Sequence, residues 1–183
     1  TEQMTPLATF LDNIDKAVDR LAQTGAQVFL ANLPLPTALP FFKAKRARLA
    51  NEGLTKNADL FFQTIEDGTQ AANQRLAARA ELYTNIHVID VNSLVTQWLA
   101  SGVKVGEETL YIEQYGGLVG LDGLHFTDTA YALLANIFLN RMSSVLGTEF
   151  PAIDIATVWA NDRERREQLL KEGFDPSQCE SYK

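Results

Sequence analysis

The sequence predicts an α/β protein built around a parallel sheet. A continuous apolar run over 28–33 is typical of a strand buried on both faces, the usual state of strands in a parallel sheet, and 86–91 predicts a second strand. Around these runs, apolar residues recur at the spacing of helices. Because strand and helix alternate along the chain, we expect parallel strands joined by right-handed crossovers.

The first helix is predicted to begin with Thr5 as the N-cap and Pro6 at the first helical position. Gly25 is the expected end of this helical segment. The strand over 28–33 is then expected to end in an irregular loop, because prolines are frequent among the residues that follow it.

Residues 41–83 have a helical pattern, which we expect to be interrupted at Gly53 and at Gly68. The second strand covers 86–91, and a further helix is expected to start near Val91. The two strands and the helices between and after them form the expected parallel unit.

A glycine-rich stretch from 102 to 123 predicts a long loop, with a short hairpin around 104–112. A strong helical pattern then runs from an N-cap at Thr127 to Gly147. We therefore predict a domain segment over 1–147 and a polar C-terminal helix or tail over 148–183.

Composition narrows the classes of partner. A net charge of −7 and a pI near 4.8 argue against nucleic acid as the main partner. No apolar run approaches the roughly 18–20 residues that a membrane-spanning helix needs. The single cysteine, Cys179, is either an incidental thiol or the site of a bridge to a second polypeptide.

The segment from Asp122 to His125 carries the clearest chemical signal. An aspartate stands three residues before a histidine, at the end of the glycine-rich loop and directly before a helix. A carboxylate bonded to one imidazole nitrogen fixes the tautomer and leaves the other nitrogen free to act as a base. The alternative interpretation is a structural histidine beside an ordinary Asp-Gly turn.

This segment resembles the last conserved block of the SGNH, or GDSL, serine hydrolases, which supplies the catalytic Asp and His. The similarity begins with Asp122-Gly123-Leu124-His125 and continues into the predicted helix as far as Asn136. Upstream, 28–34 is similar to the fourth strand of that family, 86–91 to its fifth, and 116–118 to its glycine-rich approach to the block. The resemblance implies the C-terminal half of a flavodoxin-like, three-layer α/β/α domain.

The same resemblance implies hydrolysis of carboxylic esters, with His125 as general base and then acid and Asp122 orienting it. Acyl lipids, lysophospholipids and small acetyl or aryl esters are the substrates that the family makes plausible. It implies no organic cofactor, and a secreted or periplasmic location goes with it. No histidine or cysteine pair has metal-ligand spacing, so we expect no metal.

The nucleophile of the family lies in a Gly-Asp-Ser block, and this chain contains no such sequence. We find no serine here with the strand-to-helix setting of an activated nucleophile; the serines considered are Ser93, Ser101, Ser143, Ser144, Ser177 and Ser181. The resemblance therefore implies that the nucleophilic serine and the oxyanion hole come from a missing N-terminal segment or from a separate companion chain.

Three other interpretations stay open. The main rival is a non-catalytic α/β binding or regulatory module. The basic cluster at 43–48, beside Phe41 and Phe42, is either a solvated helix face or a patch that contacts anionic lipid. Nucleotide binding at the sheet edge is weaker, because no phosphate-binding loop is present. His87 is interpreted as a structural residue of its strand.

Overall fold

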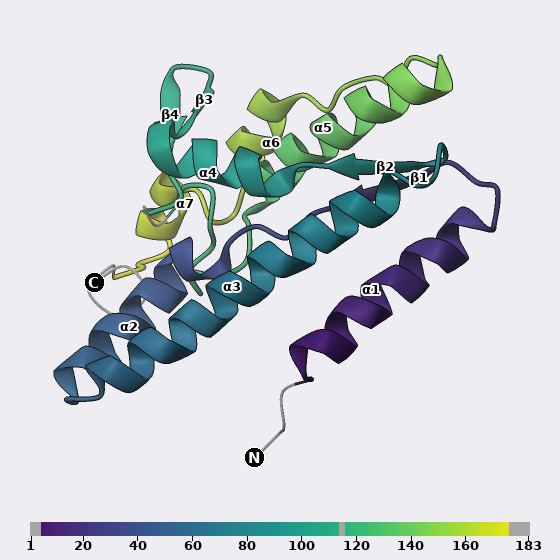
Figure 1. The fold of residues 1–183 in the computed structure, drawn as a ribbon. Helices are drawn as coiled ribbons and strands as arrows, with labels where there is room; N and C mark the ends of the chain where they lie inside the picture. The colour runs from purple at the N-terminus through teal and green to yellow at the C-terminus, as the bar shows by residue number, and fades with distance from the viewer. Residues whose placement is uncertain (1–4, 114–115, 176–183) are drawn as a thin grey trace.

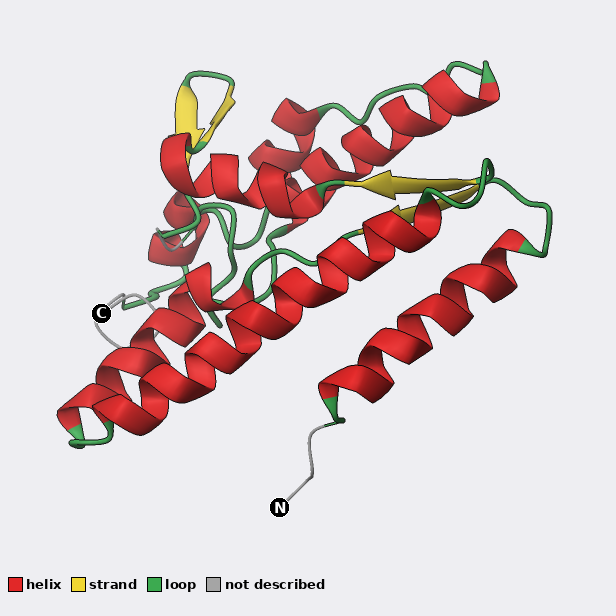
Figure 2. Ribbon diagram, in the orientation of Figure 1, coloured by secondary structure: helices red, strands yellow, loops and turns green. Residues whose placement is uncertain are grey.

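The protein combines many helices with a short parallel sheet, and it therefore belongs to the α/β class at that coarse level (Figures 1 and 2). The computed structural model describes residues 5–113 and 116–175. Its elements, in order, are α1 (Leu7–Ala22), β1 (Val28–Ala31), the 3₁₀ turn η1 (Pro36–Ala38), α2 (Pro40–Asn51), α3 (Thr55–Ala80), β2 (Ile86–Ile89), α4 (Val91–Ser101), β3 (Val103–Val105), β4 (Glu108–Leu110), α5 (Asp128–Leu146), α6 (Ile155–Asn161) and α7 (Arg166–Lys171).

The two predicted strands pair in parallel, as expected from their order. Val28 is opposite Ile86, and the register continues to Ala31 opposite Ile89. The prediction that the first strand is buried on both faces was wrong, because the residues of β1 are half-buried or exposed. In a sheet of two strands, β1 keeps one open edge, and solvent reaches its side chains from there.

Helices cover both faces of this sheet. On one face, Val28 and Ile86 pack with Val18 of α1 and Ala80 of α3. On the other, Phe29 and Ile89 belong to the larger core, which also contains residues of α4, α5 and α6. Figure 1 shows α1 and α3 on one side of the strands and α5 on the other. The loops at the carboxyl ends of the strands therefore meet between these layers.

The helical region after β1 breaks once. Gly53, with a φ of 78°, ends α2 and turns the chain into α3. The prediction of a second break at Gly68 was wrong, because α3 runs from Thr55 to Ala80 without interruption. A glycine lowers helix propensity by only about 1 kcal/mol. Burial of Phe62 and Ala72 on either side of it stabilises the helix through that point.

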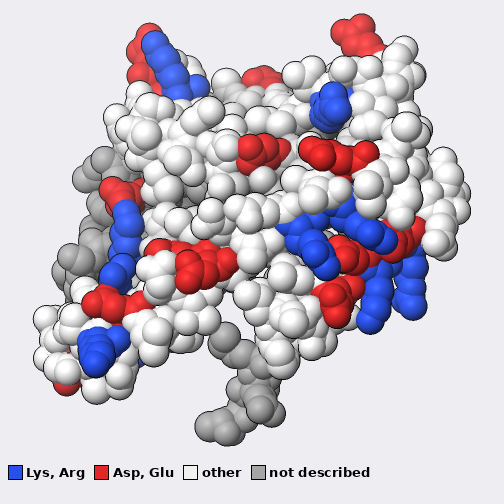
Figure 3. All heavy atoms as spheres, in the orientation of Figure 1, with Lys and Arg blue, Asp and Glu red and all other residues white. Residues whose placement is uncertain are grey.

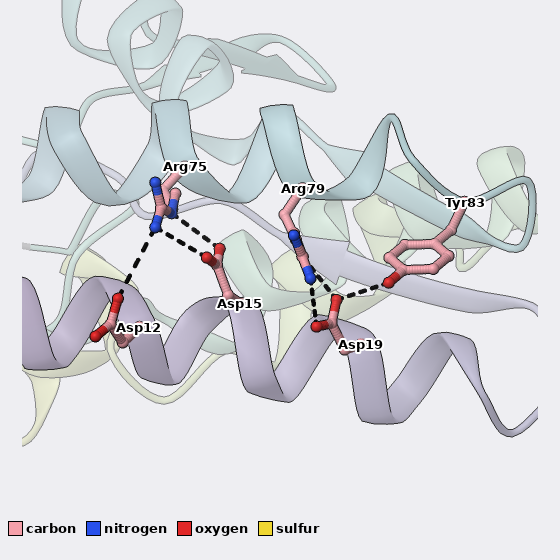
Figure 4. A network of polar contacts seen from close by, with 6 residues as sticks. All are labelled: Asp12, Asp15, Asp19, Arg75, Arg79 and Tyr83. Carbon is pink, nitrogen blue, oxygen red and sulfur yellow. Dashed lines mark hydrogen bonds and ion pairs between the residues drawn. The ribbon is translucent and has the colours of Figure 1, made fainter.

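Helix α1 starts one residue later than predicted, with Pro6 in the N-cap position and no side-chain cap. It is joined to α3 by ionic contacts along one side, which Figure 4 shows. Arg75 Nε donates to Asp15 Oδ1 at 2.9 Å, and Arg79 Nε donates to Asp19 Oδ1 at 2.6 Å. Tyr83 adds a hydrogen bond from its hydroxyl to Asp19 at 2.7 Å. We call these residues the α1–α3 ladder.

We expect the α1–α3 ladder to stabilise the fold less in acid than at neutral pH. The hydrogen bond from Arg79, with that from Tyr83, lowers the pKa of Asp19 below its ordinary value. Asp19 therefore stabilises the fold at pH values above the ordinary range of aspartate, and this contribution disappears as the pH falls through the lowered pKa. We expect Asp19→Asn to flatten that part of the stability curve, measured as the urea midpoint against pH. Asp67→Asn on α3 is the matched control, and an equal effect of both changes would contradict the assignment.

The hairpin and the helix after the glycine-rich loop are both present as predicted. Strands β3 and β4 pair antiparallel, with Val103 opposite Leu110. The Thr127 side chain caps α5 by accepting from the Ala130 N–H, and Gly147 ends that helix in the left-handed conformation. Both ends of α5 are thus determined by local sequence signals.

The C-terminal segment differs from the predicted polar helix. Residues 162–165 form a turn between α6 and α7, and the Asp162 side chain is buried rather than solvated. Trp159 of α6 lies in the main core. Burial of this indole ties 155–162 to the rest of the fold, which a charge pattern alone does not reveal.

Charges of both signs are mixed over the face seen in Figure 3, where no broad patch of one sign is visible. Within the described ranges, no helix is both long enough and apolar enough to cross a membrane.

Candidate functional site

Asp122 and His125 lie on the loop that joins β4 to α5. The loop closes on itself, because Gly120 N donates to His125 O at 2.8 Å and Gly123 N donates to Gly120 O at 2.9 Å. Gly123 has a φ of 69°, a left-handed conformation that only glycine adopts at little cost. This turn brings the Asp122 side chain back toward the imidazole that follows it.

The two predicted residues are in direct contact. His125 Nδ1 lies 2.5 Å from Asp122 Oδ2, in the arrangement by which a carboxylate fixes an imidazole tautomer. The other carboxylate oxygen, Oδ1, accepts the backbone N–H groups of Leu124 and His125, both at 2.9 Å. The carboxylate is therefore held on both oxygens, and the ring is held through it.

The electrostatics of the pair favour an ionised aspartate. Partial burial raises the pKa of Asp122, but the hydrogen bonds from the His125 ring and from the two backbone N–H groups outweigh it and lower the pKa below its ordinary value. Asp122 is thus a carboxylate at neutral pH, the form that accepts a proton-bearing nitrogen of His125.

Neighbouring elements support this loop from beneath and from the side. Phe126, beside the histidine, packs edge-on against Trp98 of α4 and against Tyr131 of α5. Phe41 N, at the start of α2, donates to Gly123 O at 3.0 Å. The segment that follows β1 therefore meets the Asp122–His125 loop, although the two are far apart in sequence.

The outer side of the pair is open. The side chain of His125 is 71% exposed and that of Asp122 is 50% exposed. Among the described residues, none hydrogen-bonds the Nε2 atom of His125. Two surface hollows of about 520 and 440 Å³ lie elsewhere, on α6–α7 and between α3 and α4 respectively, and neither is lined by this pair. The Nε2 atom can thus exchange a proton with a group that approaches from outside.

A second group of polar residues lies at the carboxyl ends of β1 and β2. Asn32 Nδ2 donates to Asp90 Oδ1 at 2.8 Å, and Asn32 Oδ1 accepts Asn92 N at 2.8 Å. Hydrogen bonds from the Ser93 hydroxyl and from the Ser93 backbone N–H lower the pKa of Asp90, and the hydroxyl has the larger effect. Sequence reasoning did not single out these residues, although polar residues directly after parallel strands are a recognised signal of a site edge.

Three of the four described serines have local hydrogen-bond partners. Ser93 Oγ donates to Asp90 Oδ2 at 2.6 Å, Ser101 Oγ donates to Gln97 O at 3.0 Å, and Ser143 Oγ accepts Phe150 N at 3.0 Å. Ser144 is exposed on α5. Ser177, Ser181 and Cys179 lie outside the described residues. The structure thus brings Asp122 and His125 together without placing a described serine beside them.

The remaining candidates are accounted for by local contacts. His87 lies on β2, with Nε2 at 2.6 Å from Gln27 Oε1 and its ring against Phe29, and burial lowers its pKa. In the basic cluster, Lys43 pairs with Glu113, and Arg46 pairs with Asp59 at 2.6 Å. Within the part of the chain that the structure describes, no group of acidic, histidine or cysteine side chains is arranged to hold a metal ion.

Comparison with known proteins adds no relative. No protein-family model matches the chain, no curated protein matches it, and no solved structure matches it. The functional argument therefore depends on the residues and geometry of this chain.

Proposed function

We propose that this chain contributes the Asp–His pair of a serine ester hydrolase of the SGNH type. The observation that supports the proposal most directly is the contact between Asp122 Oδ2 and His125 Nδ1, in a histidine side chain that is 71% exposed. In the proposed reaction, Nε2 takes the proton of a serine hydroxyl as it attacks the ester carbonyl, and returns that proton to the leaving alcohol. Asp122 orients the ring and stabilises the imidazolium.

We further propose that the described fold is the C-terminal half of a flavodoxin-like α/β/α domain. Parallel strands with helices on both faces are consistent with such a half. The pair lies on the loop before α5, and this loop contacts the segment that follows the carboxyl end of β1. Ligands of open α/β sheets bind at this edge. The resemblance to the family also carries the proposal of a secreted or periplasmic location.

The serine and the oxyanion hole are assigned to a companion N-terminal chain or segment. Val28 N donates to the carbonyl just before β2 and Asn32 N donates to Ile89 O of β2, so the next backbone groups along β1 point to its open edge. Such an edge is a template for a further strand. On α1, which packs against α3 and contacts β2, Leu7, Phe10 and Leu21 are exposed. A parallel strand added at the open edge of β1 would extend the sheet and bring its own carboxyl end toward His125.

Intact-mass spectrometry and denaturing electrophoresis of the natively purified protein test the companion. We expect a second polypeptide, or a longer chain, that contains Gly-Asp-Ser and reacts with a fluorophosphonate probe of serine hydrolases. That material is expected to hydrolyse a short-chain aryl ester. A folded 20.3 kDa species alone, with no probe labelling and no hydrolysis, would contradict the proposal.

The second candidate is a non-catalytic α/β binding or regulatory module. The observation that favours it is the open His125 side chain, with no described serine hydrogen-bonded to it. In that case, the Asp122–His125 contact only stabilises the turn before α5. Fluorophosphonate labelling separates the two candidates, because a binding module has no activated serine to react.

A further inference from the structure

The turn at residues 162–165, which we call the C-terminal turn, lies against the base of the Asp122–His125 loop. Asp162 is only 4% exposed, and its Oδ2 accepts both Thr129 N at 2.8 Å and Thr129 Oγ1 at 2.5 Å. Its Oδ1 accepts Glu164 N at 3.0 Å. The N–H groups in the first turn of α5 have no acceptor within the helix. They and the helix dipole therefore favour a buried carboxylate at this end. Asp162 therefore fastens the C-terminal turn to the start of α5.

Glu164 extends the same contact to the loop itself. Its carboxylate lies against Gly120, and the nearby N–H of Leu121, the residue directly before Asp122, favours its ionised form. Gly120 provides the space for this carboxylate, because a methyl group on Gly120 would collide with Glu164 Oε2. The loop is thus contacted on one side by Phe41, whose N donates to Gly123 O, and on another by the Glu164 carboxylate, which packs against Gly120.

We propose that Asp162 and Glu164 are positioning residues, which hold the 120–125 loop against α5 so that the Asp122–His125 hydrogen bond is already formed in the resting protein. The proposal deepens the assignment of this pair as the acid–base site and rests on that proposed function. Neither residue is assigned a contact with substrate. Their role is to reduce the motion of the loop, since a hydrogen-bonded base acts efficiently only when its geometry is preformed.

The charge around Glu164 indicates which of its properties matters. Burial, with repulsion from Asp162, Asp122 and Asp128, raises the pKa of Glu164 above its ordinary value. Because this pKa is raised, the folded state favours protonated Glu164. The stability that protonated Glu164 contributes is therefore present in acid and is lost as the pH rises through the raised pKa. A neutral side chain of the same shape that still presents an oxygen to Gly120 and the Leu121 N–H, such as glutamine, is therefore expected to keep the contact with the loop.

The test compares Glu164→Ala, Glu164→Gln and Gly120→Ala, with Glu167→Ala as the matched control. Glu167 is exposed and contacts Arg165 rather than the loop. The first readout is the tautomer of the His125 ring in long-range ¹H–¹⁵N spectra, recorded where both histidines of the chain are neutral, with His87 as the internal reference. The second is hydrogen exchange of the Leu121 amide.

Glu164→Ala is expected to shift His125 from the Nδ1–H form toward a mixture with the Nε2–H form, and to speed exchange at Leu121 by roughly five- to tenfold. Gly120→Ala is expected to do the same by displacing the carboxylate from the other side. Glu164→Gln and Glu167→Ala are expected to leave both readouts at the wild-type values. If the Glu164→Ala protein fails to fold, Gly120→Ala tests the positioning role in its place.

Unchanged tautomer and unchanged exchange in a folded Glu164→Ala or Gly120→Ala protein would overturn the positioning role. A shifted His125 tautomer together with faster exchange at Leu121 in Glu164→Gln would overturn the role of the acceptor oxygen. These readouts need no ester substrate, so they remain decisive if the protein proves to have no hydrolase activity. Conversely, hydrolysis that depends on His125 but not on Glu164 would support the proposed function and refute the positioning role.

Discussion

Replacement of His125 by alanine is expected to abolish ester hydrolysis by the assembled protein, with a fall in kcat of about 10⁶-fold. The reason is that alanine removes the only group assigned to take the proton of the serine and return it to the leaving alcohol. His125 is exposed and outside the buried core, so the variant is expected to fold. Initial rates on an aryl ester, with circular dichroism as the check of folding, measure the effect.

Asp122→Asn tests the orienting group separately. An asparagine can donate to Nδ1 and so favour the wrong tautomer, for which a loss in kcat of roughly 10⁴-fold is expected. Asp128→Asn, three residues after His125 and exposed at the start of α5, is the matched control. A wild-type rate in Asp122→Asn, or an equal loss in Asp128→Asn, would refute the assigned role of Asp122.

The pKa of Asp122 adds a pH dependence to this prediction. Because that pKa is lowered, the carboxylate persists at pH values down to and below the ordinary range of aspartate. Loss of the Asp122–His125 contact through protonation of Asp122 is therefore expected only when the pH falls through the lowered value. NMR of the His125 ring against pH in the isolated chain would follow this contact.

Leu118→Ala is expected to have the largest effect on stability near the site. Leu118 is 0% exposed and lies in the main core beneath the loop. Truncation of a buried leucine leaves a cavity and costs about 2–5 kcal/mol. Its backbone also joins the loop to α5, because Leu118 O accepts Thr127 N at 3.1 Å. Urea denaturation followed by fluorescence gives the change in the free energy of unfolding.

Leu60→Ala is the matched control for that measurement. Leu60→Ala removes the same atoms as Leu118→Ala, but Leu60 lies on α3 and is 70% exposed. Removal of an exposed leucine is expected to alter stability by no more than about 0.5 kcal/mol. If both variants lose the same free energy of unfolding, Leu118 is not the buried support of the loop that the structure shows.

The local parts of the candidate site were predictable from the sequence. Asp122, Gly123 and His125 lie within one turn, so the contact between the carboxylate and the ring depends on a few backbone angles rather than on distant residues. The N-cap at Thr127 and the end of α5 at Gly147 are equally local. Short-range steric and hydrogen-bond preferences account for these features.

Other features could not be predicted because packing against distant residues decides them. Gly68 weakens helix propensity, yet the buried residues around it keep α3 continuous. Asp162 belongs to a charged run that indicates a solvated helix, yet its carboxylate is buried against Thr129. In both cases, the free energy of tertiary contacts exceeds the small local preference.

The sequence by itself therefore determined the α/β class, the parallel order of the two strands and the pairing of Asp122 with His125. These depend on hydrophobic periodicity and on neighbours along the chain. Only the tertiary structure decided that β1 has an open edge, that the loop is exposed, and that Asp162 and Glu164 support it. Contacts between residues far apart in sequence arise from packing of the whole chain, and no local pattern encodes them.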